Sequence, residues 1–147
     1  MRGLPIRDRI VARTDRQAVE LASRLAHAEA FRLALPDTAV DFTYAVRVPD
    51  GGVDGSSVLT GLPLVNLPTG PTFWQVKSGN QTPDATAELI DGRYVTEELR
   101  RGTTGYVLFW TGQPTHRTRE TLELAFNSRL DEISPGMPRA FLLAAEI

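Results

Sequence analysis

The stretch Gly-Tyr-Val-Leu-Phe-Trp-Thr at residues 105–111 is strongly apolar and rich in β-branched and aromatic residues. Such residues favour extended backbone, and an apolar run without polar alternation is typical of a strand that is covered on both faces. Strands of that kind belong to sheets packed between helices. The stretch therefore predicts a buried central strand in an α/β fold.

Three further strands are predicted upstream of this segment. Residues 38–48 alternate in polarity and are rich in β-forming residues. Residues 49–52, Pro-Asp-Gly-Gly, have the composition of a turn, and residues 53–59 follow as a second strand. A loop rich in Gly and Pro at residues 60–72 then leads to a third strand at residues 73–78.

Helices are predicted before, between and after these strands. Residues 14–17, Thr-Asp-Arg-Gln, match a capping box, and the helix that follows should end before Pro36, because the residue preceding a proline avoids the α-helical region. Residues 86–101 and 118–130 are the next predicted helices, while residues 139–147 fit either a strand or a helix. This order (helix, three strands, helix, strand, helix) predicts a mixed sheet of about four strands flanked by helices.

The composition indicates one ordinary globular domain spanning residues 1–147, with 41% hydrophobic and 23% charged residues. No apolar run approaches the roughly 20 residues of a membrane-spanning helix. The N-terminus lacks the apolar region of a secretory signal, and the chain contains no cysteine. We therefore expect a cytoplasmic protein without membrane association.

The two ends of the chain differ in character. Residues 1–13 carry four arginines against one aspartate, which indicates a basic lead-in, whereas residues 141–147 form an apolar ending that suggests a domain of a longer polypeptide. The net charge of −2 excludes a generic polyanion binder. Any contact with nucleic acid therefore has to use a local patch or other domains.

Lys77 is the only lysine in a chain with fifteen arginines. Arginine replaces lysine on most solvated faces, but not where a compact, titratable point charge is needed. In the third predicted strand, Gln75 and Lys77 share one face, about 7 Å apart, because alternate side chains of a strand point the same way. If the second and third strands pair antiparallel, Asp54 in the run Gly-Gly-Val-Asp-Gly at 51–55 lies beside both residues.

These residue types suit phosphodiester hydrolysis assisted by Mg²⁺ or Mn²⁺. Asp54 can supply a charged oxygen ligand, Gln75 a neutral side-chain oxygen and Val76 a backbone carbonyl, and Mg²⁺ prefers such hard oxygen donors. Lys77 can orient the attacking water and stabilise the growing negative charge. The alternative interpretation is a surface hairpin, in which Asp54 is a turn residue and the other side chains are the exposed face of an edge strand.

The pattern Gly-Gly-Val-Asp54-Gly followed by Phe-Trp-Gln75-Val-Lys77-Ser-Gly resembles the PD-(D/E)XK nuclease superfamily, and more narrowly its Mrr-like restriction-endonuclease branch. The resemblance covers about residues 15–112 and implies a restriction-endonuclease-like core with the order αβββαβ. It implies that Asp54 binds the metal, that Gln75 is the second ligand and that Lys77 is the catalytic lysine. Asp50, which follows a proline, is interpreted as a turn residue.

Mrr-like proteins often add a glutamate from the first helix, and the chain offers Glu20 and Glu29. Glu29 lies on the apolar stripe of the predicted helix and should face the core. A lone carboxylate is costly there unless it is paired or bound to a metal. We therefore count Glu29 with the catalytic and metal-binding candidates and place Glu20 on the surface. An ion pair with Arg32, three residues later, is the structural alternative for Glu29.

The resemblance implies a metal-dependent endonuclease domain that hydrolyses double-stranded DNA in bacterial antiphage defence or restriction. Such domains often form the N-terminal effector of larger proteins, joined to sensor or NTPase regions, and act as assemblies of several copies. The alternative is a catalytically inactive module of the same fold that binds DNA or another protein. Replacement of an acidic ligand by the neutral Gln75 leaves this second interpretation open.

Overall fold

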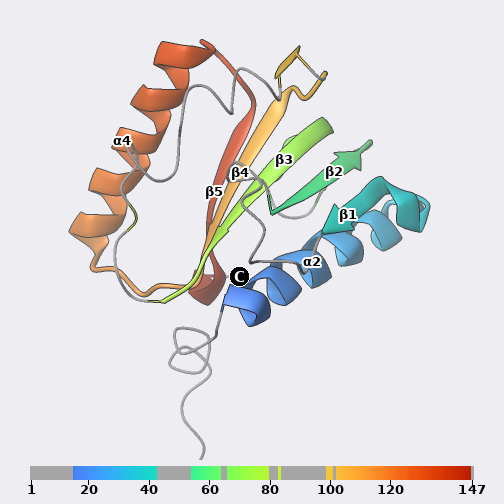
Figure 1. The fold of residues 1–147 in the computed structure, drawn as a ribbon, viewed down its shortest axis with the longest axis horizontal. Coiled ribbons are helices and arrows are strands. Elements are labelled where there is room, and N and C mark those ends of the chain that lie inside the picture. Colours follow the sequence, from blue (N-terminus) through green and yellow to red (C-terminus); the bar gives the residue numbers. More distant parts are fainter. Residues whose placement is uncertain are drawn as a thin grey trace, which may run out of the picture.

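The computed structural model of the chain describes residues 15–42, 54–63, 66–79, 83, 99–100 and 102–146. Its helices are α2 (Asp15–Arg32) and α4 (His116–Ile133), and its short 3₁₀ helices are η1 (Asp37–Ala39) and η2 (Ala144–Glu146). Its strands are β1 (Val40–Phe42), β2 (Gly55–Leu59), β3 (Gly70–Lys77), β4 (Gly105–Trp110) and β5 (Arg139–Leu143) (Figure 1).

The strands form one mixed sheet in the order β1-β2-β3-β4-β5. The first three strands pair antiparallel, whereas β3, β4 and β5 run parallel to one another. The α/β class predicted from the sequence is confirmed. The expected number of about four strands was too low for this sheet, because residues 139–143, left open between strand and helix, pair with β4 as a fifth strand.

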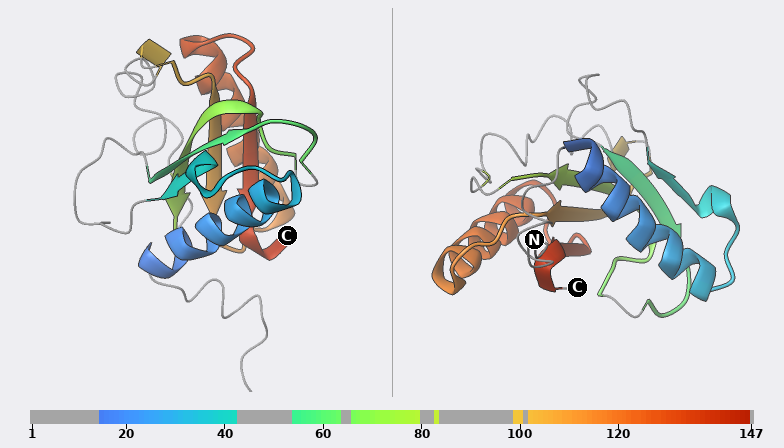
Figure 2. Two further views of the ribbon diagram at one scale, coloured as in Figure 1. Left: turned by 90° about the vertical axis from the view of Figure 1, so that its right-hand side faces the viewer. Right: turned by 90° about the horizontal axis from the view of Figure 1, so that it is seen from below.

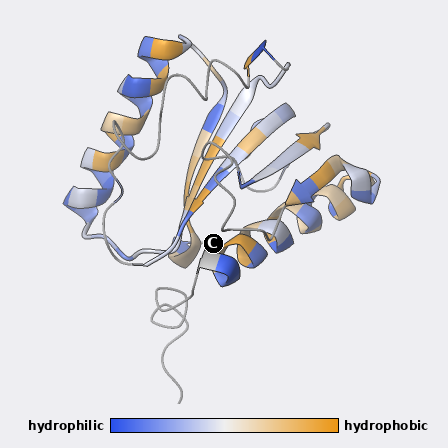
Figure 3. Cartoon of the chain, viewed as in Figure 1, coloured by the Kyte–Doolittle hydropathy of each residue, from blue (hydrophilic) through white to orange (hydrophobic). Residues whose placement is uncertain are grey.

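The two helices cover opposite faces of the sheet (Figure 2). α2 packs with Trp74, Val107 and Phe109 on one face, while α4 packs with Tyr106 and other residues on the other. All six residues of β4 are buried, as the apolar stretch predicted. Hydrophobic segments in Figure 3 accordingly lie along the strands, whereas both helices also carry hydrophilic residues. Neither helix is apolar enough, over its 18 residues, to cross a membrane.

The β2–β3 pair is held in register by packing around Trp74, a fully buried residue of β3. Its indole Nε1 donates to Ser57 Oγ on β2 at 2.9 Å, and its ring meets the Phe42 ring edge-on at a centroid distance of 5.3 Å. Gly55 lies directly against the Phe42 ring, so that a Cβ at this position would overlap it. The sequence therefore places its smallest residue where β2 begins, next to Asp54.

Several predicted elements fall partly or wholly outside the described residues. The turn at 49–52 and most of the predicted helix at 86–101 lie there, although residues 99–100 are helical. Residues 14 and 43–48 also lie outside, so the capping box is not described and the first strand is described only at its Val40–Phe42 portion. The first predicted helix does end before Pro36, and the segment predicted at 118–130 is the longer helix α4.

Candidate active site

Asp54 lies where β2 and β3 meet at one edge of the sheet. Its backbone N–H donates to the Trp74 carbonyl at 2.8 Å, although Gly55 is the residue in register with Trp74. Two successive residues therefore oppose one, which is the arrangement of a β-bulge. The Asp54 carboxylate then accepts a hydrogen bond from the Val76 backbone N–H at 2.7 Å, a donor that would otherwise continue the strand ladder. The bulge thus turns the carboxylate toward β3.

Val76 offers a backbone carbonyl at the same edge of β3. The N–H and C=O of one strand residue point to the same neighbour, and those of the next residue point to the opposite one. Because the Val76 N–H reaches Asp54, its carbonyl also points toward the β2 side. The alternation is visible at Lys77, whose carbonyl faces β4 and accepts from the Thr111 N–H at 3.1 Å.

Gln75 is buried, with 3% of its surface exposed, and its amide oxygen accepts a hydrogen bond from the Tyr106 hydroxyl. Tyr106 belongs to the neighbouring strand β4 and is also fully buried. Burial, and secondarily the nearby Asp54 carboxylate, raise the pKa of the Tyr106 phenol far above its ordinary value. The phenol therefore stays protonated and lies close to both Asp54 and Gln75.

Tyr106 is a site residue that the sequence patterns did not predict. A tyrosine in an otherwise apolar, fully buried strand is a usable signal, because a buried hydroxyl needs a hydrogen-bond partner. The sequence could not name that partner, since the parallel pairing of β3 with β4 brings Tyr106 beside Phe73 and within reach of Gln75 only in the folded chain.

Lys77 is the last residue of β3, is half-buried and alternates with Gln75 on the strand. No side-chain hydrogen bond or ion pair engages its ammonium group within the part of the chain that the structure describes. The backbone that follows is anchored to β4: the Gly79 N–H donates to Thr111 Oγ1 at 3.2 Å, and Trp110 Nε1 donates to the Gly79 carbonyl at 2.8 Å. These bonds fix the end of the strand that carries Lys77.

Glu29 is buried on α2, as the helical pattern predicted, but the structure does not bring it to the other candidates. Its carboxylate pairs with Arg32 at 3.4 Å, and Arg32 also donates to the Leu62 carbonyl. The end of α2 therefore contacts the segment after β2, whereas Asp54 precedes β2. The five residues of β2 lie between Asp54 and the segment that the end of α2 contacts, and they span about 17 Å. α2 also covers the Trp74 face of the sheet rather than the face with Tyr106.

The position of Glu29 therefore favours the ion pair with Arg32, and its assignment to the metal site stays a prediction. The burial argument was sound, but burial alone does not distinguish a metal from a cationic side chain, and Arg32, the alternative left open, supplies the charge. Glu20 is partly exposed on the same helix and pairs with Arg16 at 3.6 Å. This agrees with the predicted surface location of Glu20.

The remaining oxygen donors fit a magnesium ion. The Asp54 carboxylate, the Gln75 amide oxygen and the Val76 carbonyl are hard ligands, and their residues lie at the same sheet edge, where β2 begins and β3 ends. Within the described residues there is no group of three or more His, Cys, Asp or Glu side chains suited to a metal. A site with a single carboxylate suits Mg²⁺, which commonly keeps several waters and completes its shell with substrate phosphates.

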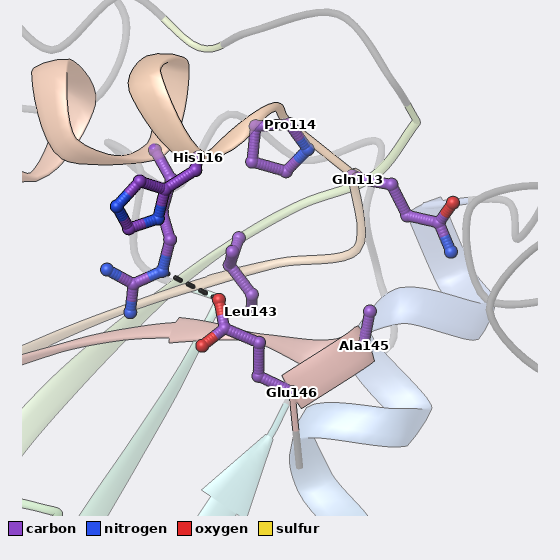
Figure 4. A pocket seen from close by; sticks show the side chains of 8 residues that line it. Gln113, Pro114, His116, Leu143, Ala145 and Glu146 are labelled. Atoms are coloured by element: carbon purple, nitrogen blue, oxygen red, sulfur yellow. Dashed lines mark hydrogen bonds and ion pairs between the residues drawn. The ribbon is translucent and has the colours of Figure 1, made fainter.

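A cavity of about 410 Å³ opens at the carboxyl ends of β4 and β5, beside the start of α4 (Figure 4). Gln113, Pro114, His116, Leu143, Ala145 and Glu146 line it. Arg119 also lines it and is held between the carboxylates of Glu146 and Glu123, each at 2.6 Å. Because β3 runs parallel to these strands, the cavity lies along the same sheet edge as the end of β3.

Comparison with known proteins gives no match to a family model, a curated protein or a solved structure. The function of the chain therefore has to be inferred from its own side chains. Three of the four predicted catalytic residues, Asp54, Gln75 and Lys77, lie at one sheet edge, together with the Val76 carbonyl. Tyr106 joins them from β4, and Glu29 does not.

Proposed function

We propose that this chain is a metal-dependent endonuclease domain that hydrolyses the phosphodiester bonds of double-stranded DNA. The observation that carries the proposal is the hydrogen bond between the Asp54 carboxylate and the Val76 N–H, which brings a carboxylate to the strand that carries Gln75 and Lys77. The antiparallel β1-β2-β3 meander with β4 parallel to β3 also supports it, because it agrees with the core implied by the resemblance to PD-(D/E)XK nucleases.

Asp54, Gln75 and the Val76 carbonyl would hold the Mg²⁺ or Mn²⁺ ion. When bound, such an ion polarises the scissile phosphate and lowers the pKa of a coordinated water. The protein contributes rigidity to this site, because the carboxylate is tied to the backbone of β3 and the amide is tied to a buried phenol. Rigid ligands leave little reorganisation for the moment of reaction.

Lys77 would act on the phosphate rather than on the metal. The Lys77 side chain begins at the end of β3, where Thr111 and Trp110 anchor the backbone. Its ammonium group can therefore extend beyond the sheet edge. A compact cation there stabilises the negative charge that grows on the phosphate oxygens and orients the attacking water.

The biological setting follows from the resemblance. We propose a cytoplasmic role in antiphage defence or restriction, as the effector of a protein that also carries a sensor or NTPase region, or as a homo-oligomer. The net charge of −2 gives the chain little general attraction to DNA. Assembly of several copies would provide affinity through multivalency, without a strongly basic surface on each.

A second candidate is a catalytically inactive module that binds DNA or protein. The observation that favours it is the buried, neutral Gln75, which leaves Asp54 as the one carboxylate among the described ligand candidates. A site of lower charge holds a cation less strongly, so the same fold can persist after loss of activity.

Plasmid cleavage by the full-length assembly in Mg²⁺ and in EDTA separates the two candidates. The nuclease proposal predicts cleavage that needs the metal and is lost in Asp54→Ala and Lys77→Ala variants. Asp41→Ala, an exposed aspartate on the neighbouring strand β1, is the matched control and should remain active. Wild-type protein as inert as the Asp54 variant, with intact folding by circular dichroism, would leave the binding module as the better explanation.

A further inference from the structure

Tyr106 has a tightly packed ring, and its hydroxyl makes a hydrogen bond at the tip. The ring meets Phe73 edge-on at a centroid distance of 4.4 Å and Phe126 at 5.4 Å, and the residue is fully buried. A phenylalanine would satisfy this packing equally well. The hydroxyl is therefore the feature to explain, and it donates to the Gln75 amide oxygen on the adjacent strand.

A glutamine beside an aspartate creates a problem for a cation site. The amide has an oxygen that accepts hydrogen bonds and an NH₂ group that donates them, and the two ends have nearly the same shape. Without a cation, the favourable arrangement turns the NH₂ group toward the carboxylate. That orientation would point two donors at the position beside Asp54 where a metal needs an oxygen.

We propose that Tyr106 is a positioning residue, whose hydroxyl donates to Gln75 Oε1 and holds the amide oxygen, rather than the NH₂ group, toward the cation position beside Asp54. This inference rests on the proposed nuclease function. The packing of the ring against Phe73 and Phe126 supports it, because this packing fixes the position of the hydroxyl beside Gln75.

The inference is tested by comparing Tyr106→Phe in two backgrounds. A carboxylate has two equivalent oxygens and cannot present a donor when it is ionised. The hydroxyl should therefore matter in the wild-type background and become dispensable in the Gln75→Glu background. Loss of packing or stability alone would act equally in both, because the same hydroxyl is removed each time.

The readouts are Mn²⁺ affinity, by electron paramagnetic resonance titration of the full-length protein with a duplex oligonucleotide, and the Mg²⁺ concentration for half-maximal plasmid cleavage. Loss of an outer-shell partner typically weakens metal binding about 10–100-fold. We expect about tenfold weakening by Tyr106→Phe in the wild-type background and less than about threefold in the Gln75→Glu background. Phe126→Leu, which disturbs the ring contact and keeps the hydroxyl, should lower Tm without changing Mn²⁺ affinity.

Two outcomes would overturn the inference while leaving the nuclease proposal intact. One is active wild-type protein whose Mn²⁺ affinity is unchanged by Tyr106→Phe. The other is equal weakening in both backgrounds, which would assign the hydroxyl a structural role only. Wild-type protein that neither binds Mn²⁺ nor cleaves DNA would instead overturn the proposed function and the role of Tyr106 with it.

Discussion

The Asp54 carboxylate accepts the backbone N–H of Val76 at 2.7 Å and so links the start of β2 to the end of β3 through a side chain. A carboxylate in this position contributes both a hydrogen bond and a negative charge. It satisfies a donor at the edge of the ladder, and its negative charge adds to burial, the larger cause, in raising the pKa of the Tyr106 phenol. Substitutions can separate these two contributions.

Asp54→Asn keeps an acceptor for the Val76 N–H and removes the charge. We expect the free energy of unfolding to change by less than about 1 kcal/mol, because one neutral hydrogen bond replaces a charge-assisted one. Metal-dependent cleavage should fall by more than about 100-fold, because Asp54 is the one carboxylate among the ligand candidates that the structure describes where β2 begins and β3 ends. Urea denaturation and plasmid cleavage measure the two effects, and full activity in this variant would remove Asp54 from the metal site.

Lys77→Arg tests whether the compact ammonium group is required. The guanidinium is planar and broader, so it cannot present the same point charge at the end of β3. We expect cleavage to fall at least about tenfold, and Lys77→Ala to reduce it about 10²–10³-fold. The half-exposed position makes either change nearly neutral for Tm. Wild-type rates in the arginine variant would show that any cation at this edge suffices.

Glu29→Gln and Glu20→Gln test whether the buried glutamate of α2 contributes to stability or to cleavage. Glu29 is 5% exposed and paired with Arg32, so its neutralisation should lower the free energy of unfolding by about 1–2 kcal/mol. Glu20 is a partly exposed partner of Arg16, and its variant should change stability by less than about 0.5 kcal/mol. Cleavage should stay within about twofold of wild type in both variants. A selective loss of cleavage in Glu29→Gln would return that residue to the site.

The ionisation of Asp131 makes the stability of the fold depend on pH. The Arg139 guanidinium, at 2.6 Å, and the Gly136 N–H lower the pKa of the Asp131 carboxyl from its ordinary value of 3.8. A lowered pKa contributes stability above the unfolded-state pKa, and that contribution is lost as the pH falls through the folded-state value. Asp131→Asn should therefore lower Tm at neutral pH, and the difference from wild type should shrink below pH 3.8. A Tm difference that is the same at pH 7 and at pH 3 would contradict this linkage.

Part of the candidate site could be predicted because it depends on local backbone geometry. The period of two in a β-strand places Gln75 and Lys77 at alternate positions wherever the strand lies. The single lysine in a chain with fifteen arginines indicated that this strand carries a functional residue. The run around Asp54 indicated the beginning of the neighbouring strand. These inferences need only the pairing of β2 with β3, which the structure contains.

For Glu29, in contrast, the sequence predicted burial on its helix but could not choose between a metal ion and Arg32 as the partner of its carboxylate. Helical periodicity reports which side chains face the core, yet it contains no information on which strand end each turn of the helix reaches. The packing of α2 places its last turn near Leu62, so that the buried carboxylate meets Arg32 instead of the Asp54 edge.

Local patterns in the chain were enough to predict the α/β class, the doubly buried strand at 105–110 and the alternation of Gln75 and Lys77 on one strand. The folded arrangement was needed to show that residues 139–143 form a fifth strand, that the Asp54 carboxylate bonds to Val76 and that the Tyr106 hydroxyl bonds to the Gln75 amide. The difference lies in the range of the interactions, because periodicity and turn chemistry act over a few residues of one segment. Strand order, hydrogen bonds between strands and the partner of a buried hydroxyl depend on segments that meet only when the chain folds.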